Sequence, residues 1–193
     1  LGLKELAIVN GGMKAWESAG KPVGKTTVQI ATSNYAPTFD ASWVATQQDV
    51  GKHLDLSNAA LVDSRPDAFY QGKTRAPAAK ISGTLPGAQQ LDFNQWFVPG
   101  TTLFVDASKA KDIAAKIQRQ QGQDMVAFCN TGHWAATDWF GLSEMAGLPH
   151  VKLYAGSMVD WTQQKDAPRM ANQPGRAESL AYDAKKWWEK TFK

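Results

Sequence analysis

Short apolar runs alternate with amphipathic stretches along most of the chain. Apolar runs bounded by turn residues predict buried strands at residues 60–63, 124–128 and 151–154. Apolar residues at helical spacing predict helices from Thr46 to His53, from Ser108 to Gln121 and from Trp134 to Met145. Strands that alternate with helices are typical of a parallel sheet with helices on both faces, so the pattern predicts an α/β fold.

Local signals set the expected ends of these helices. Thr46 with Asp49 three residues later indicates a capping box. Ser108 is the expected N-cap of the second helix, and Gly122 and Gly147 are expected to end the second and the third.

The first residues form a pattern of their own. Leu6 to Val9 is predicted to be a buried strand, followed by a glycine turn and a helix with Met13 and Trp16 on its inner face. Residues 8–16 resemble residues 153–161. Chance similarity over a short window is one explanation, and the ends of two homologous domains are the other. The matching pairs are Gly11 with Gly156, Met13 with Met158, and Trp16 with Trp161.

Composition narrows the class of protein. The chain has 193 residues, 43% hydrophobic and 20% charged, which is typical of a globular protein. A net charge of +3 without a basic block argues against nucleic acid as a partner, and no apolar run reaches the ~18 residues of a membrane span.

We expect the sequence to begin inside a larger protein. The expected parts are the end of a preceding domain plus a linker (1–30), a complete domain (38–170) and a helical tail (171–193).

The single cysteine, Cys129, lies where a parallel sheet binds its ligands. It follows the predicted strand 124–128 and precedes a polar, glycine-containing loop and a helix. One cysteine excludes an internal disulfide framework and a Cys-based zinc cluster. Loop N–H groups and a helix N-terminus favour a thiolate at such a position. Cys129 is therefore predicted to be a nucleophile rather than an inert buried residue.

Four motifs resemble those of the rhodanese sulfurtransferases and occur in that family's order. They are L-V-D-S-R (Leu61 to Arg65), I-S-G-T-L-P-G-A (Ile81 to Ala88), C-N-T-G-H-W-A (Cys129 to Ala135), and L-Y-A-G-S (Leu153 to Ser157) with Trp161. The opening N-G-G-M-K-A-W is similar to the end of a preceding rhodanese domain. The resemblance implies the catalytic half of a tandem-domain thiosulfate sulfurtransferase. Its expected partner is an N-terminal rhodanese domain, covalent or on a separate chain.

The resemblance also implies transfer through a cysteine persulfide, with no metal or other cofactor. Cys129 would take the outer sulfur of a small anionic donor such as thiosulfate, and a thiophilic acceptor, cyanide or a thiol, would remove it. Backbone N–H groups of the loop would bind the donor and stabilise the anionic persulfide. The loop residues concerned are Asn130, Thr131, Gly132, His133, Trp134 and Ala135.

The loop departs from the family's pattern in its charges. Where family members often carry arginine or lysine, this chain has Asn130, His133 and Trp134, so positive charge for a dianionic donor is reduced. His133 is the one titratable loop residue besides Cys129, and a solvated histidine is the alternative interpretation. Arg65 could reach the donor, although we favour a structural ion pair.

Residues outside the loop could complete the site. Trp96, Phe97 and Trp134 are candidates for an apolar wall that excludes water. Lys73 and Arg75 could line the mouth, with solvated surface charge as the alternative. The tryptophans expected in the core are Trp16, Trp139 and Trp161.

Other classes of protein fit parts of the sequence. A rhodanese-like phosphatase or arsenate reductase needs an arginine six residues after the cysteine to bind a tetrahedral oxyanion, and Ala135 stands there. A non-catalytic binding module usually lacks the cysteine, whereas a single-cysteine redox sensor would tolerate this loop. The resemblance implies a bacterial, exported enzyme, hence the periplasm, with the cytoplasm as the alternative.

Overall fold

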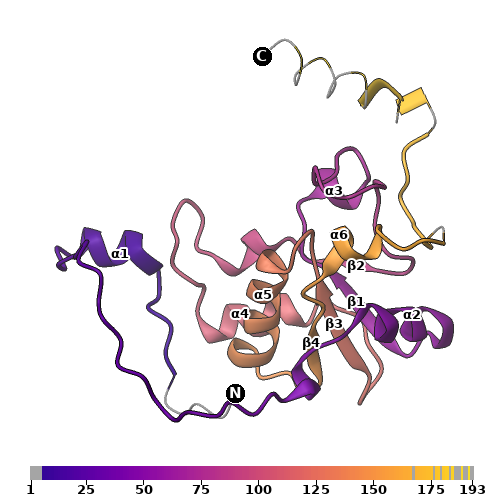
Figure 1. Cartoon of the computed structure of the whole chain (residues 1–193). Coiled ribbons are helices and arrows are strands. Elements are labelled where there is room, and N and C mark those ends of the chain that lie inside the picture. The colour runs from indigo at the N-terminus through magenta and orange to yellow at the C-terminus, as the bar shows by residue number, and fades with distance from the viewer. Residues whose placement is uncertain are drawn as a thin grey trace.

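Four parallel strands form the central sheet of the computed structural model (Figure 1). The structure describes residues 6–166 and 168–175, and beyond these residues 177, 178, 180–182, 184, 188 and 191. The strand order is β2-β1-β3-β4, which confirms the predicted parallel α/β sheet. The strands are β1 (Ala59–Asp63), β2 (Gln89–Gln90), β3 (Asp124–Phe128) and β4 (Val151–Leu153).

Helices cover both faces of this sheet, as predicted. One face carries α2 (Gln47–Leu56) and α6 (Ser157–Trp161). The other carries α4 (Ala107–Ala114), α5 (His133–Phe140) and the π-helical turn η3 (Gly141–Met145). Because the strands are parallel, the segments that follow them leave the sheet at the same edge. The remaining short helices are η1 (Ala41–Trp43), α3 (Asp67–Tyr70) after β1, and η2 (Phe93–Trp96) after β2.

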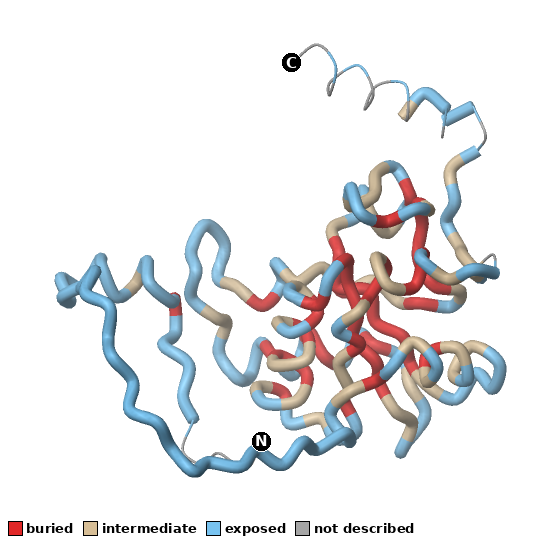
Figure 2. The backbone as a smooth tube through the Cα atoms, in the orientation of Figure 1, coloured by how far each residue is buried: buried red, intermediate tan, exposed pale blue. Residues whose placement is uncertain are grey.

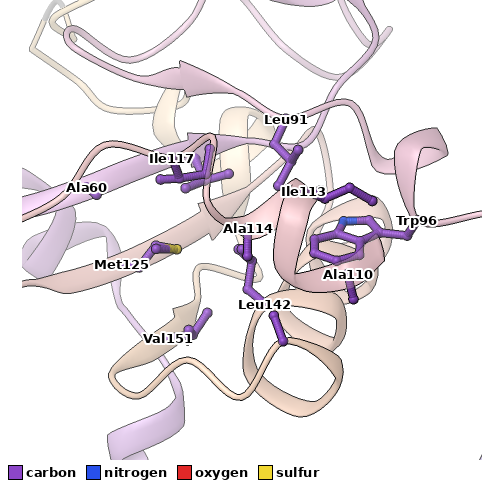
Figure 3. Packing of buried hydrophobic residues seen from close by; sticks show 12 residues of the cluster. Ala60, Leu91, Trp96, Ala110, Ile113, Ala114, Ile117, Met125, Leu142 and Val151 are labelled. Atoms are coloured by element: carbon purple, nitrogen blue, oxygen red, sulfur yellow. The ribbon is translucent and has the colours of Figure 1, made fainter. Parts of the chain in front are cut away.

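The core follows the alternation of side chains along the strands. In β1, Ala60 and Val62 belong to the cluster on the α4 face, whereas Leu61 belongs to the cluster on the α2 face. Figure 3 shows the first cluster, in which Met125 of β3 and Ile113 of α4 are both fully buried. Each large apolar side chain buried in this way contributes about 1.5–3 kcal/mol. Two packed faces hold the sheet, and with it the strand ends, in place.

The helix boundaries agree with the predictions in part. Thr46 and Asp49 form the predicted capping box, and hydrogen bonds from Thr46 lower the pKa of the Asp49 carboxyl. The cap of α4 is Asp106, whose carboxylate accepts the Lys109 N–H at 2.8 Å, so the prediction of Ser108 is wrong by two residues.

The end of α4 also differs from the prediction. The helix stops at Ala114 rather than Gln121. The N–H groups of Lys116 and Ile117 bond three residues back instead of four, and the Gln89 side chain then bonds both the N–H and the carbonyl of Gln118. The predicted third helix begins one residue early, at His133, and its last turn is π-helical.

The N-terminal segment does not form the predicted strand. Residues 6–9 are irregular and exposed, because no strand of the described chain lies beside them to pair with. They lead into α1 (Gly12–Ser18), where Met13 is 57% and Trp16 38% exposed, so the prediction of Trp16 as a core residue is wrong for this chain. Figure 2 shows the exposed segment running beside the packed domain. Trp161, by contrast, is buried as predicted.

The C-terminal residues extend from the domain as a separate segment. Ala171 and Thr84 exchange two backbone hydrogen bonds, of 2.9 and 2.8 Å, which fixes the start of this segment. The described residues between 177 and 191 are helical (Figure 1). Among the described residues, we find no helix with the length and apolar character that crossing a membrane requires.

Candidate active site

Cys129 follows the last residue of β3 and begins the loop that leads into α5. Its side chain is 1% exposed, and its sulfur accepts a hydrogen bond of 3.1 Å from the Gly132 N–H. The loop therefore folds back on its own sulfur, at the N-terminal end of α5. Both the N–H group and the helix dipole favour negative charge at Sγ.

Glycine is required at position 132 by the backbone. Gly132 has φ +88°, and a Cβ there would lie 2.7 Å from the Ala155 carbonyl oxygen. The loop thus passes against the β4–α6 connection with no room for a side chain. In this conformation the Gly132 N–H points at the sulfur.

Ser157 holds the other side of the loop. The Cys129 N–H donates to Ser157 Oγ at 2.9 Å, and that hydroxyl donates to the Tyr154 carbonyl at 2.8 Å. Ser157 is fully buried and has φ +54°, a conformation that costs a non-glycine residue about 1–2 kcal/mol. The N–H of Met158 also donates to the Cys129 carbonyl. Sequence reasoning missed this role, although Ser157 lies within both the repeat and the fourth motif.

Arg65 forms a buried ion pair beneath the loop. Its guanidinium donates to both carboxylate oxygens of Asp63, at 2.8 and 2.6 Å, and to the Gly83 carbonyl at 2.8 Å. Thr84 donates to the same carboxylate at 2.6 Å. The remaining Arg65 nitrogen reaches Asn130 Oδ1 at 3.5 Å. The structure thus places Arg65 where its charge is balanced by Asp63 and where it contacts the loop through Asn130.

The other predicted loop residues differ in their surroundings. His133 is exposed, with Nδ1 3.3 Å from the hydroxyl of Thr131, which is also exposed. Ala135 is fully buried against Cys129. Trp134 packs against this small cluster and is half-buried.

The partners of Trp134 are not the ones that the sequence suggested. Its ring stacks on Phe93 at 5.0 Å between centroids and meets the edge of Phe69 at 5.7 Å. Trp96 instead lies in the core, where its indole N–H donates to Asp138, and Phe97 stacks on Phe104. The wall beside Cys129 is thus built from α3 and η2 together with α5.

The two candidate cations at the mouth have partners of their own. Lys73 lies 3.5 Å from Asp67, and Arg75 lies over the Tyr182 ring at 5.1 Å. Lys73 and Tyr182 also line a cavity of about 450 Å³ between the segment after α3 and the C-terminal residues. In the described part of the chain, no three His, Cys, Asp or Glu side chains come close enough to hold a metal ion.

Asp138 is a buried carboxyl on α5, behind the loop. Burial raises the pKa of this carboxyl well above 3.8, and the neighbouring Ser64 hydroxyl and the hydrogen bond of 2.9 Å from Trp96 only partly oppose that shift. Its second oxygen, Oδ2, is buried without a hydrogen-bond partner among the described residues. Burial therefore shifts the ionisation of this carboxyl toward higher pH in the folded protein.

This raised pKa gives a testable dependence of stability on pH. Above about pH 4 the unfolded state has released the Asp138 proton, whereas the folded state still binds it. The free energy of unfolding therefore falls as the pH rises, by ~1.4 kcal/mol per pH unit, until the folded-state pKa is passed. Asp138→Asn keeps the oxygen that accepts from Trp96 and cannot ionise. Its free energy of unfolding, relative to the original protein, should rise between pH 4 and pH 7. Urea titrations that show a constant difference across this range would contradict the assignment.

Comparison with known proteins agrees with this geometry. The rhodanese-like domain profile matches residues 46–164. The chain is 29% identical over 170 residues to the sulfur carrier protein TtuD of Thermus thermophilus, covering 83% of this chain and 59% of that protein. It is 24% identical over 180 residues to 3-mercaptopyruvate sulfurtransferase of Rattus norvegicus, covering 93% and 60%. For a putative thiosulfate sulfurtransferase of Mycobacterium tuberculosis, the identity is 27% over 174 residues, covering 86% and 62%. The chain therefore spans about three fifths of the length of these relatives.

Solved structures show the same fold. Tum1 from Saccharomyces cerevisiae superposes with a TM-score of 0.70 at 18% identity, over 85% of this chain and 60% of Tum1. EanB, in complex with ergothioneine linked to a cysteine persulfide, superposes with a TM-score of 0.77 at 21% identity, over 90% of this chain and 43% of EanB. The family profile covers more than half of the chain and includes Arg65, Cys129 and Ser157. The chain belongs to the rhodanese-like domain family.

Proposed function

We propose that this chain is a sulfurtransferase that moves sulfane sulfur from thiosulfate or a related donor to cyanide or a thiol. The observation that carries the proposal is the sulfur of Cys129, which accepts the Gly132 N–H in a tight loop at the start of α5. Relatives named as sulfurtransferases and as a sulfur carrier support it.

The reaction divides into two steps on one sulfur atom. Cys129 thiolate attacks the outer sulfur of thiosulfate, the S–S bond of the donor breaks, and sulfite leaves with the electron pair. Cys129 then carries a terminal sulfur with one negative charge. Cyanide attacks that sulfur, thiocyanate leaves, and the thiolate returns. The Gly132 N–H and the start of α5 stabilise the anion at each stage.

The geometry also bears on the alternative functions. A phosphatase or arsenate reductase would need an arginine at position 135, where this chain has Ala135, fully buried against Cys129. A redox sensor would instead be oxidised at Cys129 and would release no sulfite from thiosulfate. In a non-catalytic binding module, nothing would require the hydrogen bond from the Gly132 N–H to the Cys129 sulfur.

The identity of the sulfur donor is tested by measuring the product that each candidate donor releases. Sulfite formed from thiosulfate, and pyruvate formed from 3-mercaptopyruvate, should each be followed with cyanide as the acceptor. Parallel lines in double-reciprocal plots are the expected signature of the two-step reaction. Intersecting lines, or no release from either donor, would contradict the proposal.

We also propose that the N-terminal segment packs against a preceding rhodanese domain. Five of its apolar side chains are exposed: Leu6, Ile8, Val9, Met13 and Trp16. Its described links to the catalytic domain include Phe104 N–H to Asn10 Oδ1 and Thr102 hydroxyl to the Gly11 carbonyl, both of 2.8 Å. The relatives, of whose length this chain spans about three fifths, leave room for such a domain. Location in the periplasm or the cytoplasm stays a prediction.

A double substitution separates this proposal from a segment that folds back on the catalytic domain. Ile8→Ser with Met13→Ser should leave the free energy of unfolding of the present chain unchanged within the ~0.5 kcal/mol usual for surface changes. In a longer protein that contains the preceding domain, the same pair should cost several kcal/mol. A clear loss of stability in the present chain, measured by urea unfolding, would show that the segment packs on the catalytic domain instead.

A further inference from the structure

A small cavity lies on the α4 face of the sheet, toward the edge opposite to Cys129. Its volume is about 220 Å³, and residues from α4, from the start of β3 and from the segment after η3 line it. Met125, the second residue of β3, lies at its base, whereas Cys129 follows the last residue of that strand. The cavity, which we call the α4 cavity, is therefore separate from the candidate active site.

Two irregular helix ends surround the α4 cavity. After α4 stops at Ala114, the chain tightens, because the Ile117 N–H bonds back only to the Ala114 carbonyl. In the π-helical turn η3, the Ala146 N–H instead bonds to the Gly141 carbonyl, five residues back, which makes that turn wider. Side chains between the tight turn and the wide one leave the cavity unfilled.

The base of the α4 cavity is apolar. Ile117, Met125 and Ala146 line it and belong to the buried cluster on this face, and Leu148 packs against that cluster. Figure 3 shows Ala114, Ile117 and Met125 close together. The volume equals that of about seven water molecules in the liquid, and apolar walls favour a short apolar group over water.

Two cations, Lys111 and Arg119, complete the lining. Lys111 is exposed and Arg119 is half-buried. Nη1 of Arg119 donates to the carbonyls of Pro149, at 3.0 Å, and of Gln123, at 3.4 Å. Neutral partners thus fix the guanidinium beside the cavity without balancing its charge.

No carboxylate in the described part of the chain compensates these two cations. Neither forms an ion pair there, and the described lining of the cavity contains no acidic residue. Asp124, which precedes Met125, is paired with Lys152 at 2.7 Å. An apolar base beside two cations without acidic partners complements a ligand that has an apolar body and a carboxylate.

We propose that the α4 cavity binds a small apolar carboxylate, such as hexanoate. Arg119 binds the carboxylate group, Lys111 adds positive charge, and the hydrocarbon chain lies against Met125 and Leu148. The cavity is smaller than the ~300–1,000 Å³ of sites for drug-sized ligands, which limits the ligand to a short chain. This binding site goes beyond the proposed function and does not depend on it, because Cys129 takes no part.

Three probes separate the contribution of charge from that of the chain. Hexanoate has both, hexanol lacks the charge and acetate lacks the chain. Titrations at constant ionic strength are followed by the amide NMR shifts of Ala115, Arg119 and Leu148. We expect hexanoate to bind with a Kd of about 1 mM, as suits so small a ligand. Hexanol and acetate should each bind at least about tenfold more weakly.

Matched variants test whether the lining residues are responsible. Arg119→Gln removes the charge but keeps a donor for the two carbonyls, and the Kd for hexanoate should rise about tenfold. Lys116→Gln is the control, because this lysine follows the same helix but bonds the Gln95 side chain and does not line the cavity. Its Kd should equal that of the original protein. Ala115→Leu fills the cavity from an exposed position and should abolish binding.

The outcomes separate this inference from the proposed function. Hexanoate that shifts none of the three amides saturably, or that shifts only the loop after Cys129, overturns the inference. Hexanol that binds as tightly as hexanoate, or equal losses in Arg119→Gln and Lys116→Gln, would show that the cavity does not recognise a carboxylate. Sulfur transfer enters none of these measurements, so failure of either proposal leaves the other standing.

Discussion

Cys129→Ser is expected to lower sulfur transfer from thiosulfate to cyanide on the order of 10⁴-fold or more, as loss of a nucleophile does in other enzymes. Serine preserves the size of the side chain and can accept the Gly132 N–H, but an alkoxide does not form near neutral pH and oxygen cannot carry the sulfane sulfur. The measurement is the rate of thiocyanate formation. Cys129 is the single cysteine of the chain, so no other thiol can replace it.

The folded state of this variant provides the control. The Cys129 N–H and carbonyl keep their bonds to Ser157 and Met158, so Tm should change little. Cys129→Ala, which removes the polar atom altogether, should be equally inactive. Turnover retained in either folded variant would show that the chemistry lies elsewhere.

Gly132→Ala is expected to have the largest effect on stability. A residue with a Cβ at φ +88° costs about 1–2 kcal/mol, and the Cβ would lie 2.7 Å from the Ala155 carbonyl, which adds about 1–3 kcal/mol of over-packing. Relief of the clash moves the Gly132 N–H away from Cys129 Sγ, so transfer should fall as well. Urea unfolding measures the first effect and thiocyanate formation the second.

Gly147→Ala is the matched control for the clash. Gly147 also has a positive φ, +72°, but a Cβ there would have no neighbour within 4 Å. The free energy of unfolding of this variant should fall only by what a positive φ costs a residue with a Cβ, and its activity should be unchanged. Equal losses in the two variants would mean that the contact with Ala155 is unimportant.

The sheet and the position of Cys129 at the end of a strand could be predicted because their signals are local. The apolar residues of β1 and β3 are bounded by turn residues, and Cys129 follows one strand directly. Thr46 and Asp49 satisfy each other within one helical turn, so the capping box needs no tertiary contact. Such features depend on residues that are neighbours along the chain.

The rest of the site depends on contacts between distant residues. Ser157 reaches Cys129 only because β4 lies beside β3, and Phe93 meets Trp134 only because β2, β1 and β3 end at one edge. The prediction of Ser108 as the N-cap of α4 is wrong because aspartate and serine are both favoured at N-caps. The sequence pattern alone does not show whether Asp106 or Ser108 caps the helix. The strand predicted at residues 6–9 had the right composition but lacks a partner strand in the described chain.

The measurement that tests the central claim most directly is the intact mass of the protein before and after incubation with a sulfane donor. The account predicts a gain of the mass of one sulfur atom with thiosulfate, its loss on treatment with cyanide, and no gain in Cys129→Ser. An unchanged mass with every donor, or a gain that persists in Cys129→Ser, would contradict the account.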